Sequence, residues 1–342
     1  MSDAKRRRLE APPAKVLGRE EYLAKLREVL HPMENPAAMY NSLVGGVTTD
    51  PELMTIPIHD HAVVRGHAIF DTCSIVGGRL YRLDIHLDRH MDSAERARIS
   101  LPFGSSVQEC KDQMRSIVAQ TVVASGVRDG GVRIYTSAGP GNFSITSEGC
   151  TSAFYVVVLR PTGAVVKDSD LDGIHEVTVD LPLKPPLLAS TKTNNYLLNA
   201  MTAMIARDNG GKFGILLDGD DCIAEASVLC CAFVTADKRL ITPSFDKILA
   251  GTTVRKVLDL GKRLVAEGHL AAVSQERIPK TVAKQCVEMM LCGGDSHLLP
   301  VIRWDGQPVG TGSAGPIAKK LLQLVNEDAK SGDDDHYELV YP

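Results

Sequence analysis

The chain has 342 residues, of which 44% are hydrophobic, and a formal net charge of −4. This length and composition predict a soluble globular protein that buries a large core and divides into two domains. The slight negative charge gives no sign of the excess of positive charge expected of a protein that binds nucleic acid or an acidic membrane surface. No apolar run approaches the ~20 residues needed to span a bilayer, and the first residues lack the apolar segment of a secretory signal. We therefore expect an intracellular, cytoplasmic protein that acts on small molecules.

The cysteines and histidines do not predict a metal centre. The eight cysteines form no C-x-x-C pair and no zinc spacing, which predicts reduced thiols. His59, Asp60 and His61 carry possible ligand atoms, but they lie in a short polar connection without a second ligand cluster. Because structural zinc needs four spaced nitrogen or sulfur ligands, we expect no metal site here.

Residues 1–38 predict a basic arm followed by a short helix. The arm begins with Lys5-Arg6-Arg7-Arg8, which favours a solvated, disordered tail, with a nuclear import signal as the alternative. Apolar residues at helical spacing predict a helix from Glu20 to about Leu30.

Residues 39–160 predict a small α/β domain. Gly77-Gly78 between two β-rich runs is typical of a hairpin, and Asp84 is expected to cap the next helix. On that helix Arg89 lies outside the apolar stripe of Leu87, Met91 and Ala94. The expected strands cover 40–47, 68–76, 79–83, 132–136 and 153–159, and a second helix covers 106–124.

Residues 161–173 read as a linker, and 174–330 predict a larger domain. Its first helix carries Leu197, Met201, Met204 and Ile205 at helical spacing, which predicts a buried stripe. Gly251-Thr-Thr253 is expected to begin a second helix. The expected strands cover 174–179, 213–217, 222–224, 231–235 and 240–243. Residues 331–342 predict an acidic, mobile tail.

Near the C-terminus, residues 310–315 match the dinucleotide-binding pattern G-x-G-x-x-G. The match lies too close to the chain end for a βαβ unit with an acidic residue ~20 positions on, so it fails as a Rossmann motif. We expect only a glycine loop before the last helix.

Four features of the chain suit one cofactor. Lys192, beside Ser, Thr and Asn just before a helix, can become a nucleophile when it is desolvated. Arg89 offers a guanidinium that can donate two parallel hydrogen bonds to an oxyanion. Thr252-Thr253 place free backbone amides at a helix N-terminus, which binds phosphate. Glu225 supplies a carboxylate. Pyridoxal phosphate needs such a set, because its aldehyde condenses with lysine and its ring nitrogen needs an acidic partner.

The same stretches resemble the class IV aminotransferases, the pyridoxal-phosphate enzymes of fold type IV, from about Tyr40 to Leu322. The carrying segments are FDTCSIVGGRLYRLDIHLDRHMDSAERARISLP, STKTNNYLLNA, GILLDGDDCIAEAS and LITPSFDKILAGTTVRKVL. Within the family, DHAVVRGHAIFD and SAGPGNFS are most similar to the plant-type D-amino-acid enzymes. The resemblance implies a small N-terminal α/β domain, a larger barrel-like C-terminal domain with the cofactor between them, and a homodimer.

The resemblance also implies roles for individual residues. Lys192 forms the imine with the cofactor aldehyde and later moves the substrate α-proton. Glu225 pairs with the ring nitrogen, and Phe70 and Tyr196 stand near the substrate. Residues expected to hold the phosphate or the ring are Arg89, Ser227, Leu249, Thr252, Thr253, Gly294 and Asp295.

Two departures limit the substrate assignment. Bacterial D-amino-acid enzymes of this family have a carboxylate-binding arginine where this chain has Ala138, so Arg65, Arg133 or backbone amides must replace it. After Glu225, Ser227 alone keeps a side-chain hydroxyl, so phosphate binding is expected to depend more on main-chain amides.

We therefore expect a ping-pong transaminase that moves an amino group from a D-amino acid such as D-alanine to a 2-oxo acid. A branched-chain L-amino-acid aminotransferase and an aminodeoxychorismate lyase are the alternatives within the family. A non-catalytic protein that binds nucleic acid through its basic arm is the alternative of another class; it predicts affinity that falls steeply with salt. We expect amino and 2-oxo acids as partners, and neither nucleic acid nor membrane.

Overall fold

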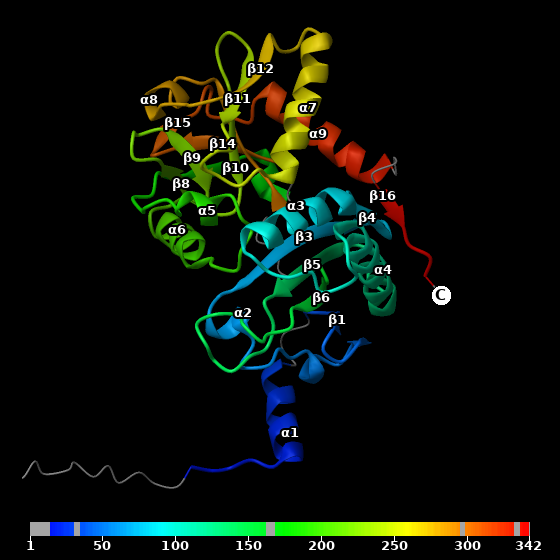
Figure 1. The fold of residues 1–342 in the computed structure, drawn as a ribbon. Coiled ribbons are helices and arrows are strands. Elements are labelled where there is room, and N and C mark those ends of the chain that lie inside the picture. Colours follow the sequence, from blue (N-terminus) through cyan, green and yellow to red (C-terminus); the bar gives the residue numbers. More distant parts are fainter. Residues whose placement is uncertain (1–13, 31–34, 162–167, 295–297, 332–335, 342) are drawn as a thin grey trace, which may run out of the picture.

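The computed structural model describes residues 14–30, 35–161, 168–294, 298–331 and 336–341. Two lobes, each built around one sheet, stack end to end (Figure 1). The lower lobe holds most of the first half of the chain, and the upper lobe holds most of the second half.

The lower lobe contains a seven-stranded antiparallel sheet in the order β16-β4-β3-β5-β6-β1-β2. Helices α3 and α4 cover one face, and their apolar side chains form a core with alternate residues of β3, β5 and β6. The strands are β1 (Ala38–Asn41), β2 (Gly46–Thr48), β3 (Ala68–Val76), β4 (Arg79–Tyr81), β5 (Gly130–Ser137), β6 (Ala153–Leu159) and β16 (His336–Glu338). The helices are α1 (Arg19–Leu30), η1 (Pro51–Leu53), α2 (His61–Val64), α3 (Leu83–Arg96) and α4 (Val107–Ser125).

Three local expectations for the lower lobe were wrong. The strand expected over 40–47 is a tight hairpin of β1 and β2, because residues 42–45 form a turn. Asp84 does not cap α3, because Arg82 in a left-handed conformation precedes the helix and Asp84 accepts hydrogen bonds from Arg115 instead. The strand expected over 79–83 ends at Tyr81, because Leu83 already begins α3.

The upper lobe contains a nine-stranded mixed sheet. One apolar cluster fills its concave side, and a second lies between the sheet and helices α7 and α9. The strands are β7 (Ile174–Glu176), β8 (Ile215–Leu217), β9 (Ile223–Ala226), β10 (Cys230–Val234), β11 (Arg239–Pro243), β12 (Ala272–Glu276), β13 (Glu288–Cys292), β14 (Leu298–Trp304) and β15 (Gln307–Pro308). The helices are η2 (Asp168–Asp172), α5 (Pro186–Ala189), α6 (Leu197–Asp208), α7 (Thr252–Ala266), α8 (Lys280–Ala283) and α9 (Pro316–Ser331).

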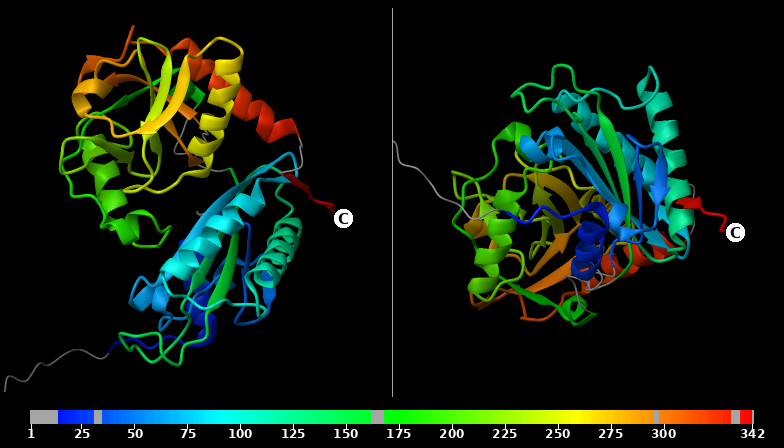
Figure 2. Two further views of the ribbon diagram at one scale, coloured as in Figure 1. Left: turned by 45° about the horizontal axis from the view of Figure 1, so that its top comes forward. Right: turned by 90° about the horizontal axis from the view of Figure 1, so that it is seen from below.

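The end of the chain returns to the lower lobe. After α9, β16 pairs with β4 and becomes the edge strand of the first sheet (Figures 1 and 2). The Tyr341 hydroxyl donates to the Val127 carbonyl, which holds the last residues against α4 and β5. The mobile tail expected after residue 330 is thus wrong for residues 336–341, because backbone pairing fixes them.

Helix α6 buries a different face from the one expected. Leu197 and Met204 are 73% and 64% exposed, and Met201 is 37% exposed. The buried residues are Asn199, Thr202 and Ala206. The helix turns a polar side chain inward because the Asn199 amide donates to the Ser227 carbonyl beside a pocket. Leu197, Met201 and Met204 of its apolar stripe therefore lie outside, whereas Ile205 packs against the core as expected.

None of the helices in the described part of the chain has both the length and the apolar character needed to cross a membrane.

Candidate active site

Lys192 lies where the two lobes meet. Its segment runs along β3 of the lower lobe: the Phe70 amide donates to the Lys192 carbonyl at 2.8 Å, and the Asn194 amide donates to the Ala68 carbonyl at 3.0 Å. The Lys192 amide itself donates to the Ser93 hydroxyl of α3. These bonds give the backbone of a loop the fixed geometry of a strand pairing.

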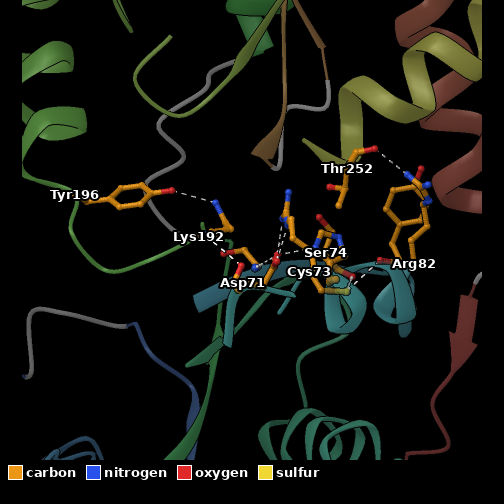
Figure 3. A network of polar contacts seen from close by, with 12 residues as sticks. Asp71, Cys73, Ser74, Arg82, Lys192, Tyr196 and Thr252 are labelled. Atoms are coloured by element: carbon orange, nitrogen blue, oxygen red, sulfur yellow. Dashed lines mark hydrogen bonds and ion pairs between the residues drawn. The ribbon is translucent and has the colours of Figure 1, made fainter. Parts of the chain in front are cut away.

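The Lys192 amine is enclosed by aromatic rings and charges. Its Nζ donates to the Tyr196 hydroxyl at 3.1 Å and lies 4.6 Å from the centre of the Phe70 ring (Figure 3). Burial, followed by the nearby Arg89 charge, lowers the pKa of Lys192 to about 8. At pH 8 about half of these amines are therefore uncharged and able to act as nucleophiles.

One end of the pocket is arranged for an anion. The N-terminus of α7 opens into it, and Gly251 supplies no side-chain cap, so the first-turn amides have no intrahelical acceptor. By contrast, α9 begins against the Glu288 carboxylate, which accepts from its first-turn amides at 3.1 and 2.7 Å. The Ser227 hydroxyl, in the same pocket, is buried and has no hydrogen-bond partner among the described residues.

Arg89 is held at this pocket by a buried carboxylate. Its Nε and Nη2 donate to the two oxygens of Asp71 at 2.7 Å each, and His86 Nδ1 lies 2.8 Å from Asp71 Oδ1. Burial alone would raise the pKa of Asp71, but the Arg89 charge and then His86 hold it well below its usual range. Asp71 is thus an ionised carboxylate that fixes the orientation of Arg89.

The other end of the pocket holds Glu225 on β9. Its carboxylate is almost fully buried, and burial raises its pKa, while the Lys184 charge and the Leu249 amide oppose this rise. Lys184 Nζ lies 3.9 Å from Glu225 Oε1. An acidic group therefore faces the same pocket as Lys192.

The structure brings most of the predicted site residues together. The pocket is lined by eleven of the thirteen: Phe70, Arg89, Arg133, Lys192, Tyr196, Glu225, Ser227, Leu249, Thr252, Thr253 and Gly294. Arg65 is not among the lining residues, because its guanidinium donates to the carbonyls of Val64, Phe143 and Ser144. Asp295 lies outside the described residues.

Sequence reasoning missed four charged or polar residues of the site: Asp71, Arg82, His86 and Lys184. Asp71 carried a signal, because the alternation of β3 places it among the inward positions 69, 73 and 75, where a charge needs a partner. Arg82, whose guanidinium donates to the Thr252 carbonyl at 3.2 Å, carried none, since it depends on contact between the lobes (Figure 3).

Comparison with known proteins agrees with this geometry. Residues 68–304 match the family model of the class IV aminotransferases. The chain belongs to this family. It is 41% identical over 297 residues to the chloroplastic D-amino-acid transaminase of Arabidopsis thaliana, covering 86% of this chain and 77% of that protein. It is 24% identical over 286 residues to a putative branched-chain-amino-acid aminotransferase of Methanocaldococcus jannaschii, covering 83% and 94%.

The fold of this class IV aminotransferase is also similar to solved structures. The PLP form of the branched-chain amino acid aminotransferase from Thermobaculum terrenum superimposes with a TM-score of 0.73 at 22% identity, covering 88% of this chain and 96% of that one. The expected fold type IV is therefore confirmed, with a mixed α/β architecture and two sheets.

The expected enzyme class and cofactor are likewise confirmed: the chain is a transaminase that depends on pyridoxal phosphate. The residues present fit this cofactor. An orphaned, buried Ser227 hydroxyl and an open helix N-terminus suit a phosphate. The cations that line the pocket, Arg82, Arg89, Arg133, Lys184, Lys192 and Lys256, outnumber the acid Glu225 in its wall and Asp71 bound behind Arg89.

Proposed function

We propose that this class IV aminotransferase moves the amino group of a D-amino acid such as D-alanine to a 2-oxo acid in two half-reactions. The observation that carries the reaction is the buried Lys192 amine between an anion-binding helix N-terminus and the Glu225 carboxylate. The preference for D-amino acids is supported by the 41% identity with the Arabidopsis protein, whose name states that specificity.

The proposed roles follow from position. Amides of Thr252 and Thr253, the Ser227 hydroxyl and the Arg89 guanidinium bind the phosphate, with Gly294 close by. Leu249 contacts the ring, and Glu225 holds a proton on the ring nitrogen. Bound pyridoxal phosphate supplies an aldehyde that condenses with amines and a ring that accepts electrons from the substrate Cα.

Lys192 then has two tasks in this proposal. Its Nζ would hold the cofactor aldehyde, and once free it would take the proton from the substrate Cα and return it on the cofactor side. The Tyr196 hydroxyl, 3.1 Å away, keeps Nζ oriented between these positions. Burial raises the pKa of Tyr196 to about 12, so the phenol stays neutral through this cycle.

We assign the substrate carboxylate to Arg133 rather than Arg65. Arg133 lines the pocket opposite Thr72 in the β3–β5 ladder, on the same face as Phe70. In the described part of the chain its guanidinium has no hydrogen-bond or ion-pair partner, whereas the Arg65 guanidinium is saturated by carbonyls. An unpaired guanidinium at the pocket wall suits a carboxylate.

The test is a spectral titration of the loaded enzyme with single D- and L-amino acids. We expect D-alanine, and not L-leucine, to bleach the visible absorption of the cofactor. Bleaching by L-leucine alone would assign a branched-chain L-specific enzyme. Release of pyruvate from aminodeoxychorismate without a 2-oxo-acid acceptor would assign a lyase.

A homodimer is also part of the proposal. The outward stripe of α6, formed by Leu197, Met201 and Met204, continues to the exposed Leu187 of α5, and such patches mark protein interfaces. Light scattering of the wild type and of Met204→Glu tests this surface, and an unchanged dimer in the variant would exclude it.

We further propose a cytoplasmic location. Because the Arabidopsis relative is named chloroplastic, imaging of a tagged protein must distinguish these two compartments.

A further inference from the structure

Lys184 lies in the Pro-rich segment before α5, and its ammonium is buried against the Glu225 end of the pocket. Its Nζ is 3.9 Å from Glu225 Oε1 and 5.3 Å from the centre of the Tyr196 ring. The side chains of Lys184 and Glu225 are each only 11% exposed. Because a lysine gives up hydration in this way mainly when it is paired, Lys184 is a fixed neighbour of Glu225.

The charged and titratable groups that face Glu225 come from several segments. Lys184 and Lys192 are cations, the Leu249 amide lies against the carboxylate, and Cys230 of β10 is the cross-strand neighbour. Burial raises the pKa of the Cys230 thiol to about 12, so this group stays neutral. Lys192 commits its nitrogen to the cofactor aldehyde in the proposed function. Lys184 is then the permanent cation in this set.

We propose that Lys184 is a positioning residue that keeps the Glu225 carboxylate ionised and in place. The proton that lies between Glu225 and a ring nitrogen then comes from the ligand or from solvent when the ligand binds, and is not already stored on Glu225. This inference rests on the proposed function, because it takes Glu225 as the partner of the ring nitrogen.

The number of protons taken up on ligand binding differs between a pocket with the Lys184 charge and a pocket without it. With Lys184 present, the empty pocket holds a carboxylate, so a ligand with an unprotonated ring nitrogen binds with uptake of about one proton from solvent. Without the Lys184 charge, burial drives Glu225 toward the neutral acid, which already carries that proton. The same ligand then binds without proton uptake at this position.

The first experiment needs no ligand. Infrared spectra of the full-length, cofactor-free protein at neutral pH should show a new carboxylic-acid band in Lys184→Met, which disappears in Lys184→Met/Glu225→Gln. Lys184→Arg keeps the charge and should lack the band. Lys184→Gln provides a second neutral variant with a polar head. The matched control is Lys212→Met, which removes another largely buried lysine paired with a carboxylate, Asp170, in the same lobe.

The second experiment measures proton uptake with a pH indicator during binding of pyridoxal phosphate and of its analogue with CH in place of the ring nitrogen. The proton uptake measured with the analogue is subtracted from that measured with pyridoxal phosphate. This removes the protons that are taken up or released when the phosphate binds and when Lys192 reacts. Whatever proton the free ligand carries, this difference should be about one proton per site lower in Lys184→Met and Lys184→Gln than in wild type, Lys184→Arg and Lys212→Met.

Neutral variants without the acid band, or with the same proton difference as wild type, would overturn the role of Lys184. A wild-type protein that binds neither ligand would instead overturn the proposed function. The infrared comparison distinguishes the two failures, because it reports on Lys184 and Glu225 alone.

Discussion

The two ends of the pocket use opposite chemistry. At α7 the pocket is lined by the uncapped helix N-terminus, and the unpartnered Ser227 hydroxyl, Arg82 and Arg89 line the same pocket, while the acid Asp71 is bound to Arg89. At the β9 end, Glu225 faces the pocket and Lys184 supports it from the side. In the proposed function, a phosphate would bind at α7 and a protonated ring nitrogen at Glu225. Lys192 lines the same pocket, as this orientation requires.

The largest effect should come from removing the group between the two ends. Lys192→Ala is expected to lower transamination by about a thousandfold or more, because nucleophile and proton carrier are lost together. A coupled assay with D-alanine and a 2-oxo acid measures the rate. The control Lys212→Ala should keep full activity; undiminished transfer in Lys192→Ala would refute the central role of this amine.

The second largest effect should come from removing the charge of Glu225 on β9. Glu225→Gln is expected to lower kcat by about a hundredfold, because a neutral amide does not hold a proton on a ring nitrogen. Affinity for phosphate-bearing ligands should change little, since the α7 end is intact. A variant that loses binding but keeps kcat would reverse the assignment of the two ends.

Loosening Arg89 tests the α7 end. Asp71→Asn breaks a buried ion pair and should cost about 3–5 kcal/mol of stability, with at least tenfold weaker binding of pyridoxal phosphate. Asp84→Asn is the matched control on α3, the helix that carries Arg89, because Asp84 is 43% exposed and pairs with Arg115 for about 1 kcal/mol or less. Thermal melts and equilibrium dialysis measure the two effects, and equal losses in both variants would contradict the buried role of Asp71.

The substrate side of the pocket offers a smaller effect. Arg133→Gln should raise KM for the amino acid about tenfold or more with a smaller change in kcat, as expected for loss of a charged hydrogen bond. Arg65→Gln should leave KM unchanged, since its guanidinium binds carbonyls of its own loop. The reverse pattern would assign the carboxylate to Arg65.

The smallest effect concerns pH. Because the pKa of Lys192 is lowered to about 8, the uncharged fraction of its amine should rise about fivefold between pH 7 and 8 and then level off. The rate at which the cofactor-free protein takes up pyridoxal phosphate, followed by absorbance, should show this curve. A rate that keeps rising tenfold per unit beyond pH 9 would indicate an ordinary exposed lysine.

The sequence predicted the positions of helices and strands better than it predicted which face of a helix is buried. The helices α4, α7 and α9 and the hairpin of β3 and β4 lie close to where their caps, glycines and periodicity placed them. The stripe of α6 was assigned to the wrong side, because periodicity identifies an apolar face but not what covers it. The C-terminal strand β16 was missed, since its pairing with β4 joins residues more than 250 positions apart.

The sequence by itself determined the chemistry: a lysine, a carboxylate, an arginine and an uncapped helix start in an order that predicts one cofactor and one family. Only the tertiary structure decided how these groups are tuned. Asp71 fixes Arg89, Lys184 supports Glu225, and burial lowers the pKa of Lys192, and each effect depends on distances between segments remote along the chain. Charge interactions and desolvation act through space, so a linear pattern can name the groups but not their protonation states.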